Sequence, residues 1–287
     1  NTCTGWPART AAEPGAEPTG ARHMATRKSK APRWAPFPYD AAPFSVDLAT
    51  LKKRWKALHA GDAEPWPKRV EVQQAWALFH AGDFQGACEA GLAAGGDGFT
   101  VANKAQAIHA HYLVDDADLK RERLLAVAAR AEAQQQADPD NAGAYYWHGN
   151  ALGRYSQSIS VAQALAEGLG HRIKQLLETA IELQPKHADA HIALASFHAE
   201  LIHKVGRLLA HAQGADAASA LRLYRRALEL DPGSAIARIE YANGLVMLDG
   251  DRQMAQAEAL YAEAAACKPL DAMQKLDVEL AKSELDD

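Results

Sequence analysis

The chain has 287 residues, a formal net charge of −5, 48% hydrophobic residues and only 7% aromatic residues. This is enough apolar material for a large core, but no stretch approaches the roughly 18 apolar residues of a membrane-spanning helix. Segments in which Val, Ile or Thr alternate with polar residues are missing, which argues against strands. The composition therefore favours an alanine-rich, all-α protein.

Cysteine usage and the N-terminus predict a cellular location. The three cysteines, Cys3, Cys88 and Cys267, form no Cys-x-x-Cys pair. An odd, sparse set argues against a disulfide framework and fits a reducing compartment. The N-terminus shows no apolar core of the secretory type. We therefore expect a cytoplasmic protein.

Residues 1–43 differ in composition from the rest of the chain, since they hold seven of the thirteen prolines. The stretch before Met24 resembles upstream sequence and is excluded from the fold. Proline prevents a helix here, and we predict a disordered or strap-like extension that buries its aromatic rings against the first helices. A Pro-rich ligand for another protein is the alternative. The aromatic residues of the strap are Trp34, Phe37, Tyr39 and Phe44.

The N-terminal part of the chain is also basic. Residues 1–58 carry ten Lys/Arg against four Asp/Glu. A basic tail can bind nucleic acid or anionic lipid, but a solvated tail explains the same charges. The basic run at Arg27 to Lys30 is too short for a binding motif. We therefore expect no nucleic acid and no membrane among the partners.

Helical patterns begin after the strap, and we predict a domain of degenerate helix pairs over 44–138. A first helix is expected from an N-cap at Ser45 to about His59. Two pairs follow, the second with Asp116 or Asp118 as a cap. The expected helices of these pairs are 69–81 with 84–94, and 99–114 with 118–137.

A repeat marked by prolines occupies the remainder, 139–287. Pro139, Pro185, Pro232 and Pro269 each end a helical pattern, at intervals of 46, 47 and 37 residues. The surplus over a repeat of about 34 residues lies in two inserts whose apolar residues keep helical spacing. We expect these inserts to add helical turns, with breaks near Gly168–Gly170 and Gly214.

Positions around the prolines resemble the tetratricopeptide repeat (TPR) over about residues 69–280. The pattern has an aromatic or leucine eight residues before the proline, an alanine five before it and a small residue ten after it. The long helices are most similar to the T components associated with TRAP transporters and to regulators of microtubule dynamics. The resemblance implies a non-enzymatic, all-α right-handed solenoid of about five helix pairs. The residues that carry it are Leu177, Tyr224 and Tyr261, then Ala180, Ala227 and Ala264, then Gly149, Ala195 and Ala242.

The resemblance also implies a concave groove lined by the first helix of each pair. Positions seven and eleven residues after the prolines are expected to face it. Tyr and Ile at the seventh position argue against a carboxylate clamp, while Asn150 and Asn243 either bind a ligand or satisfy neighbouring backbone. The predicted groove residues are Tyr146, Asn150, Arg154, Ile192, Ser196, Ile239 and Asn243.

Motifs of catalysis are missing from the sequence. There is no Gly-x-Ser-x-Gly, no phosphate-binding loop and no dinucleotide pattern. His187 and His191 share a helical face that continues to His198, with His203 as a further candidate, and such a set can hold a metal. More often, however, such residues are hydrogen-bonded within the helix stack. We therefore expect no catalytic residue, no metal and no cofactor.

The function that these patterns favour is an adaptor that binds a peptide or protein partner in the concave groove. The alternative is a small-ligand-binding protein similar to the TRAP-associated components, for which a deep apolar pocket is the distinguishing feature. The identity of the partner and the oligomeric state stay open.

Overall fold

The computed structural model describes residues 34–286, and all structural statements below concern that part of the chain. Cys3, the stretch before Met24 and the basic run at Arg27 to Lys30 lie outside the described residues. The α-helices are α1 (Leu48–Leu58), α2 (Val70–Ala81), α3 (Phe84–Ala94), α4 (Gly98–Tyr112), α5 (Ala117–Ala137), α6 (Ala142–Ser156), α7 (Val161–Ala166), α8 (Leu169–Leu183), α9 (Ala188–Val205), α10 (Arg207–Ala212), α11 (Ala217–Leu230), α12 (Ala235–Asp249), α13 (Met254–Ala265) and α14 (Ala272–Asp286).

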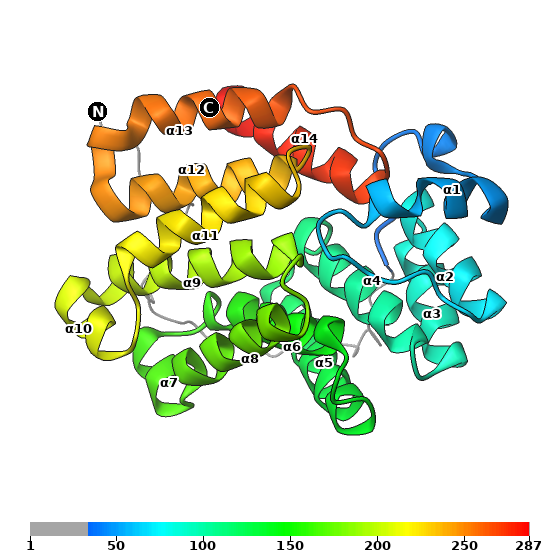
Figure 1. Cartoon of the computed structure of the whole chain (residues 1–287), viewed down its shortest axis with the longest axis horizontal. Helices are drawn as coiled ribbons and strands as arrows, with labels where there is room; N and C mark the ends of the chain where they lie inside the picture. The colour runs from blue at the N-terminus through cyan, green and yellow to red at the C-terminus, as the bar shows by residue number, and fades with distance from the viewer. Residues whose placement is uncertain (1–33, 287) are drawn as a thin grey trace, which may run out of the picture. The chain divides into compact units, whose positions relative to one another are not determined.

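These helices stack in pairs. The pairs are α2 with α3, α4 with α5, α6 with α8, α9 with α11, and α12 with α13, and each pair packs on the next (Figure 1). Two short 3₁₀ helices, Ala42–Phe44 and Gly250–Gln253, complete the secondary structure, and no strand occurs between residues 34 and 286. The predicted all-α solenoid of about five helix pairs is confirmed.

Local chemistry explains where the helices begin. The Asp116 side chain accepts a hydrogen bond from the backbone N–H of Leu119, as one of the two predicted caps of α5. The prediction of Ser45 as the cap of α1 is wrong. Asp47 caps this helix by accepting from the N–H of Thr50 at 2.7 Å. Ser45 follows the 3₁₀ helix, and its hydroxyl donates to the carbonyl of Ala41.

The two long inserts form separate short helices. In the first insert, α6 ends at Ser156 and Ser160 caps α7, so the chain breaks before the predicted glycines as well as at Gly168. In the second insert, α9 does gain turns and runs to Val205. Gly206, at φ +81°, then separates it from α10, a break that the apolar spacing does not predict. The expectation of simple added turns is therefore correct only for α9.

The proline-rich strap packs on the first helices. Phe44 is buried, and the Phe37 ring meets the Phe84 ring edge-on with centroids 6.4 Å apart. The centroid of the Trp34 ring lies 4.4 Å from that of the His109 ring. Tyr39, in contrast, is 39% exposed. Over residues 34–44, one ring of the strap, Phe44, is buried and two, Trp34 and Phe37, are half-buried against the first helices, whereas Tyr39 lies at the surface.

The last helix returns to the first helices. Ala272 and Leu276 of α14 belong to the same core cluster as Trp76 and Phe79 of α2. The Arg54 guanidinium donates to the carbonyl of Leu270 at 2.7 Å. Figure 1 shows α14 beside α1 and α2. The stack of pairs therefore closes on itself, since its last helix packs on its first pair.

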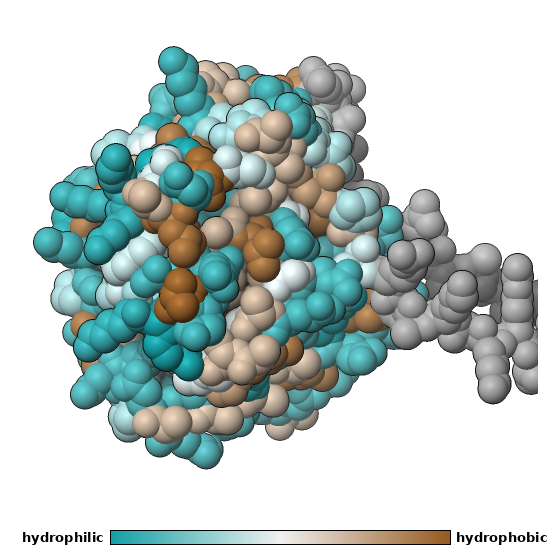
Figure 2. Space-filling model, turned by 90° about the vertical axis from the view of Figure 1, so that its right-hand side faces the viewer, coloured by the Kyte–Doolittle hydropathy of each residue, from teal (hydrophilic) through white to brown (hydrophobic). Residues whose placement is uncertain are grey.

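The face of the molecule drawn in Figure 2 is mainly hydrophilic. On the side that lies at the right of Figure 1, hydrophobic side chains emerge in small areas among hydrophilic ones (Figure 2). Such scattered apolar surface is normal for a folded domain. Among the described helices, none combines the length and the hydropathy that crossing a membrane requires.

Candidate ligand cavity

A cavity of about 200 Å³ lies at the centre of the closed stack. Its walls come from the first helices α4, α6, α9 and α12, from α7, α8 and from the returning α14. Val161 and Leu165 of α7 line it while remaining 40% and 53% exposed, so α7 lies at its mouth. The cavity therefore depends on both the repeats and the first insert.

One wall of the cavity is apolar. Helices α6, α8 and α9 contribute large hydrophobic side chains that are buried or half-buried. Alanine and glycine at the facing positions leave room for a ligand between these side chains. The main apolar lining residues are Trp147, Leu169, Ile173, Leu177, Ile192, Phe197 and Leu201.

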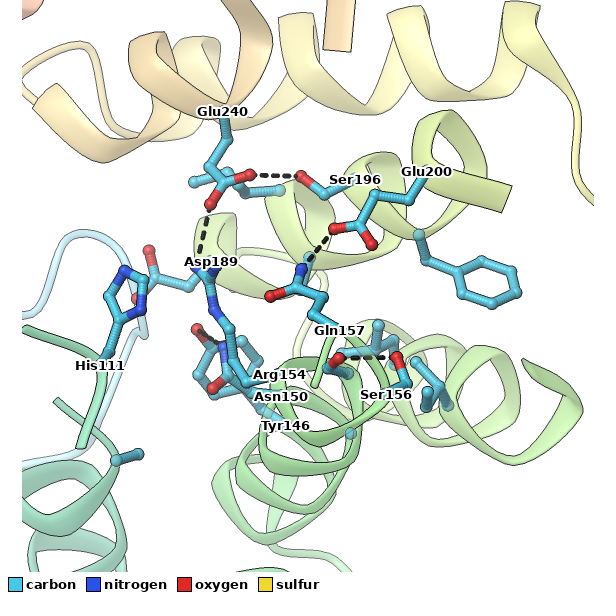
Figure 3. A pocket seen from close by; sticks show the side chains of 18 of the residues that line it. His111, Tyr146, Asn150, Arg154, Ser156, Gln157, Asp189, Ser196, Glu200 and Glu240 are labelled. Carbon is cyan, nitrogen blue, oxygen red and sulfur yellow. Dashed lines mark hydrogen bonds and ion pairs between the residues drawn. The ribbon is translucent and has the colours of Figure 1, made fainter. Parts of the chain in front are cut away.

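A chain of polar contacts crosses the cavity from α6 to α12. The Arg154 guanidinium donates to Oε1 of Glu240 at 2.9 Å, and the Ser196 hydroxyl donates to Oε2 of Glu240 at 2.9 Å (Figure 3). Ser196 Oγ also lies 2.9 Å from the Tyr224 hydroxyl. Arg154 and Glu240 neutralise each other's charge. Because Glu240 accepts through both oxygens, it also links α12 to α6 and to α9, and so connects three helix pairs.

A second polar group lies towards the mouth. The Gln157 amide donates to Oε1 of Glu200 at 2.5 Å, and Lys204 donates to Oε2 of Glu200 at 3.2 Å. Figure 3 shows Gln157 and Glu200 facing each other between α6 and α9. Glu200 is thus paired as well.

Two further carboxyl groups have no cationic partner among the described residues. Asp277 of α14 is 3% exposed and accepts a hydrogen bond from the Tyr112 hydroxyl. Asp189, in the first turn of α9, is partly buried, and no described residue donates to its side chain. Burial raises the pKa of Asp189 to about 7, although Lys104 opposes the shift. Burial likewise raises the pKa of Asp277 to about 7, despite the Tyr112 hydrogen bond. In both cases the low-dielectric surroundings disfavour the charged form.

A buried network of ionisable side chains connects α4 with the first helices and with the start of α14. Lys104 Nζ lies 2.6 Å from Asp62, which lies 2.8 Å from His59 Nδ1. The two Nε2 atoms of His59 and His80 are 3.2 Å apart, and His80 Nδ1 lies 2.7 Å from Asp271. Burial lowers the pKa of His59 to about 4.

Five of the seven predicted groove residues come together at the cavity. Tyr146, Asn150, Arg154, Ile192 and Ser196 line it. The Asn150 amide donates to the Tyr146 hydroxyl at 3.3 Å, so it contacts a side chain and not the backbone of a neighbouring helix.

The other two residues lie elsewhere. Ile239 is buried in a cluster with Val278 and Ala281 of α14. Asn243 accepts a hydrogen bond from Tyr261 at 2.5 Å. The repeat register predicts that a residue points inwards, but it does not predict that α14 covers that position.

Sequence reasoning missed Lys104, Asp189, Glu240 and Asp277. Asp189 lies between two of the candidate metal-binding histidines, while Asp277 lies in a helix outside the paired repeats. A signal existed for Glu240, since it directly follows the predicted groove residue Ile239 and precedes Asn243 by three residues. Nothing in the sequence placed it opposite Arg154.

His187, His191 and His198, which were considered as metal ligands, each form a hydrogen bond with a backbone atom. His187 caps α9 through Nδ1, which accepts from the N–H of Ala190. His191 Nδ1 contacts the carbonyl of His187 at 2.9 Å, and His198 Nδ1 accepts from the N–H of Asp216. Over residues 34–286, no three His, Cys, Asp or Glu side chains gather in a metal-binding arrangement.

Comparisons with known proteins define the fold. No family model matches the sequence, and no curated protein matches it. Among solved structures, the chain is similar to a thermophilic TPR protein of Thermus thermophilus, with a TM-score of 0.52 and 16% identity, over 75% of this chain and 98% of that chain. The likeness concerns the fold: this is a TPR-like helical-repeat protein.

Proposed function

We propose that this protein is a non-catalytic binding protein that holds a compact amphipathic ligand in its central cavity. The observation that carries the proposal is the closure of the stack by α14 on α2, which turns the inner face into a bounded cavity. Its volume of about 200 Å³ is below the roughly 300–1,000 Å³ of sites for drug-sized ligands. A small molecule fits this space better than a long peptide.

The second candidate is the adaptor function, in which a partner protein inserts one or two side chains. The TPR-like fold favours this function, because stacked helix pairs present a preformed surface. The exposed residues of α7 at the mouth, Val161 and Leu165, are where such a partner would first make contact. A cytoplasmic location remains a prediction for either candidate.

The proposal is tested by filling the cavity. Ala193→Trp places an indole on the lining, whereas Ala129→Trp adds the same group to an exposed position of α5. Hexanol, hexanoate and hexylammonium are titrated calorimetrically into the wild type and both variants. At least one probe should bind the wild type and Ala129→Trp but not Ala193→Trp. Binding of no probe, or equal binding to both variants, would overturn the proposal.

The adaptor function is distinguished from small-molecule binding by whether a protein or a small molecule co-purifies with the chain. Native mass spectrometry of protein purified from its host should show a co-purified small molecule that is lost from Ala193→Trp. A co-purified protein that is retained by Ala129→Trp and lost from Ala193→Trp supports the adaptor instead.

A further inference from the structure

The charges in the cavity wall do not balance. The wall carries three cations, Lys104, Arg154 and Lys204, and four carboxylates, Asp189, Glu200, Glu240 and Asp277. Each cation already has a carboxylate partner: Asp62, Glu240 and Glu200, respectively. Asp189 and Asp277 are therefore the two carboxyl groups of the wall that have no cationic partner among the described residues.

Asp277 is the more deeply placed of the two. It is 3% exposed, and only the Tyr112 hydroxyl donates to it among the described residues. That bond uses Oδ1, so no described residue donates to Oδ2, although a carboxylate can accept several hydrogen bonds. Among the described residues, the fully buried side-chain atoms without a partner are Trp76 Nε1 and His187 Nε2, so Oδ2 of Asp277 keeps surface that is accessible from the cavity. A donor inside the cavity can therefore reach it.

Asp189 also lines the cavity, and a backbone hydrogen bond fixes its position. Its N–H donates to the carbonyl of Gly61 at 2.9 Å, which joins the start of α9 to the loop after α1. The helix cap is His187, so the Asp189 carboxylate is not occupied in capping. Figure 3 shows the Asp189 side chain among the lining residues. Position 189 thus carries a carboxylate to which no described residue donates.

We propose that the cavity selects a ligand that carries an ammonium or guanidinium group on a short apolar body, with Asp189 and Asp277 receiving the cation. This inference rests on the proposed function, because it names the chemical class of the ligand in that same cavity. The cation donates to carboxylate oxygens that have no other donor among the described residues, while the apolar body lies against Trp147, Ile173 and Phe197.

The electrostatics of the surroundings support this assignment. Lys104 lowers the pKa of both Asp189 and Asp277 from a distance, but its hydrogen bond, at 2.6 Å, goes to Asp62. The raised pKa values of Asp189 and Asp277 show that the cavity disfavours two bare carboxylates. A bound cation would supply the compensation that the protein itself does not provide.

The same chemistry has two sources. A free amine can enter through the mouth at α7, and the lysine or arginine side chain of a partner can enter the same way. Hexylammonium represents the first. A terminally blocked tripeptide with a central lysine represents the second, with the central-methionine tripeptide as its neutral counterpart.

The decisive measurement compares six-carbon probes that differ only in the head group. At pH 8, hexylammonium should bind the wild type at least about tenfold more tightly than hexanol or hexanoate, the effect of one charge-assisted hydrogen bond. In Asp189→Asn/Asp277→Asn this preference should disappear while hexanol binding is kept. The exposed pair Asp140→Asn/Asp251→Asn changes the net charge equally and should retain the preference.

The other possible results show whether the cationic ligand class alone is wrong or whether ligand binding in the cavity is wrong as well. If hexanoate binds best and Ala193→Trp blocks it, the cavity binds ligands but the cationic class is wrong. If calcium chloride raises the melting temperature as hexylammonium does, and the double aspartate variant loses both effects, the site takes an inorganic cation and the inference is wrong. Preference for the lysine tripeptide over both the methionine tripeptide and hexylammonium identifies a partner side chain as the source.

Discussion

The imidazole of His80 and the carboxylate of Asp271, 191 residues apart in the chain, meet with Nδ1 and Oδ2 separated by 2.7 Å. His80 lies near the end of α2, and Asp271 directly precedes α14. The other oxygen of Asp271 accepts from the N–H of Gln274 at 2.8 Å and caps α14. The buried Asp271 side chain therefore caps the N-terminus of α14 and also connects this helix to α2.

Asp271→Ala should destabilise the protein by about 2–4 kcal/mol, because it removes a helix cap and leaves His80 without its buried partner. Asp271→Ser keeps a capping oxygen but is too short to reach His80. Asp216→Ala removes only the exposed cap of α11 and should cost about 1 kcal/mol. Denaturant unfolding measures all three. Equal losses for Asp271→Ala and Asp216→Ala would contradict the role of the His80 contact.

Removing the uncompensated carboxyl groups should change how stability depends on pH. Asp189 and Asp277 have pKa values of about 7 in the fold and about 4 when unfolded. The folded state therefore binds more protons than the unfolded state between pH 4 and 7, so their contribution favours folding below about pH 4 and is lost as pH rises through 7. Relative to the wild type, Asp189→Asn/Asp277→Asn should gain stability across this range.

The gain is at most about 1.4 kcal/mol per pH unit for each group. The wild type and the double variant share the other titratable groups around the two sites, so these groups affect the stability of both proteins. They include Lys104, Tyr112, Asp62 and Asp271. His59, whose pKa is lowered to about 4, destabilises both as pH falls below about 6.5. The difference between wild type and variant, measured by urea unfolding at pH 5, 6, 7 and 8, isolates the two aspartates. A difference that does not depend on pH would refute the prediction.

The contact between Arg154 and Glu240 should be energetically coupled. Both side chains are mostly buried, at 23% and 16% exposure, and they join α6 to α12. A double-mutant cycle of Arg154→Ala and Glu240→Gln should give a coupling free energy of about 1–3 kcal/mol. The exposed pair Arg226 and Glu229 provides the matched cycle, which should give below about 0.5 kcal/mol. Coupling of the same size in both cycles would mean that burial adds nothing to the cavity pair.

Gly244→Ala should disturb the support of the cavity. A Cβ atom at position 244 would lie 2.4 Å from the buried Tyr224 ring, whose hydroxyl contacts Ser196. Overpacking of this kind costs about 1–3 kcal/mol. Gly153→Ala is the control, since nothing lies within 4 Å of its Cβ position, and it should stabilise α6 by about 0.5–1 kcal/mol. Thermal unfolding of both variants checks the prediction, and stabilisation of Gly244→Ala would contradict it.

Much of the fold could be predicted because helices begin and end through local chemistry. The expected helices at 69–81 and 84–94 match α2 and α3 to within one residue. The errors have local causes as well. Ser45 and Asp47 are both capable caps, and only the 3₁₀ helix before them assigns the role to Asp47. Gly206 interrupts a pattern whose apolar spacing continues.

The candidate site was less predictable, because it depends on which surfaces meet. Tyr146 and Ile239 occupy equivalent repeat positions, yet Tyr146 lines the cavity and Ile239 is covered by α14. The repeat pattern places both side chains on an inner face. It contains no information about a helix that follows the last pair and returns to cover part of that face.

The helical repeat can be read from the amino-acid sequence, because each pair is specified by caps, prolines and apolar spacing within some 40 residues. The closure of the stack cannot, and neither can the cavity in which Asp189 and Asp277 have no cationic partner among the described residues. Closure depends on curvature accumulated over five pairs. The state of each carboxyl depends on groups from α4, α9 and the approach to α14, which are far apart in sequence and become neighbours only when the last helix packs on the first.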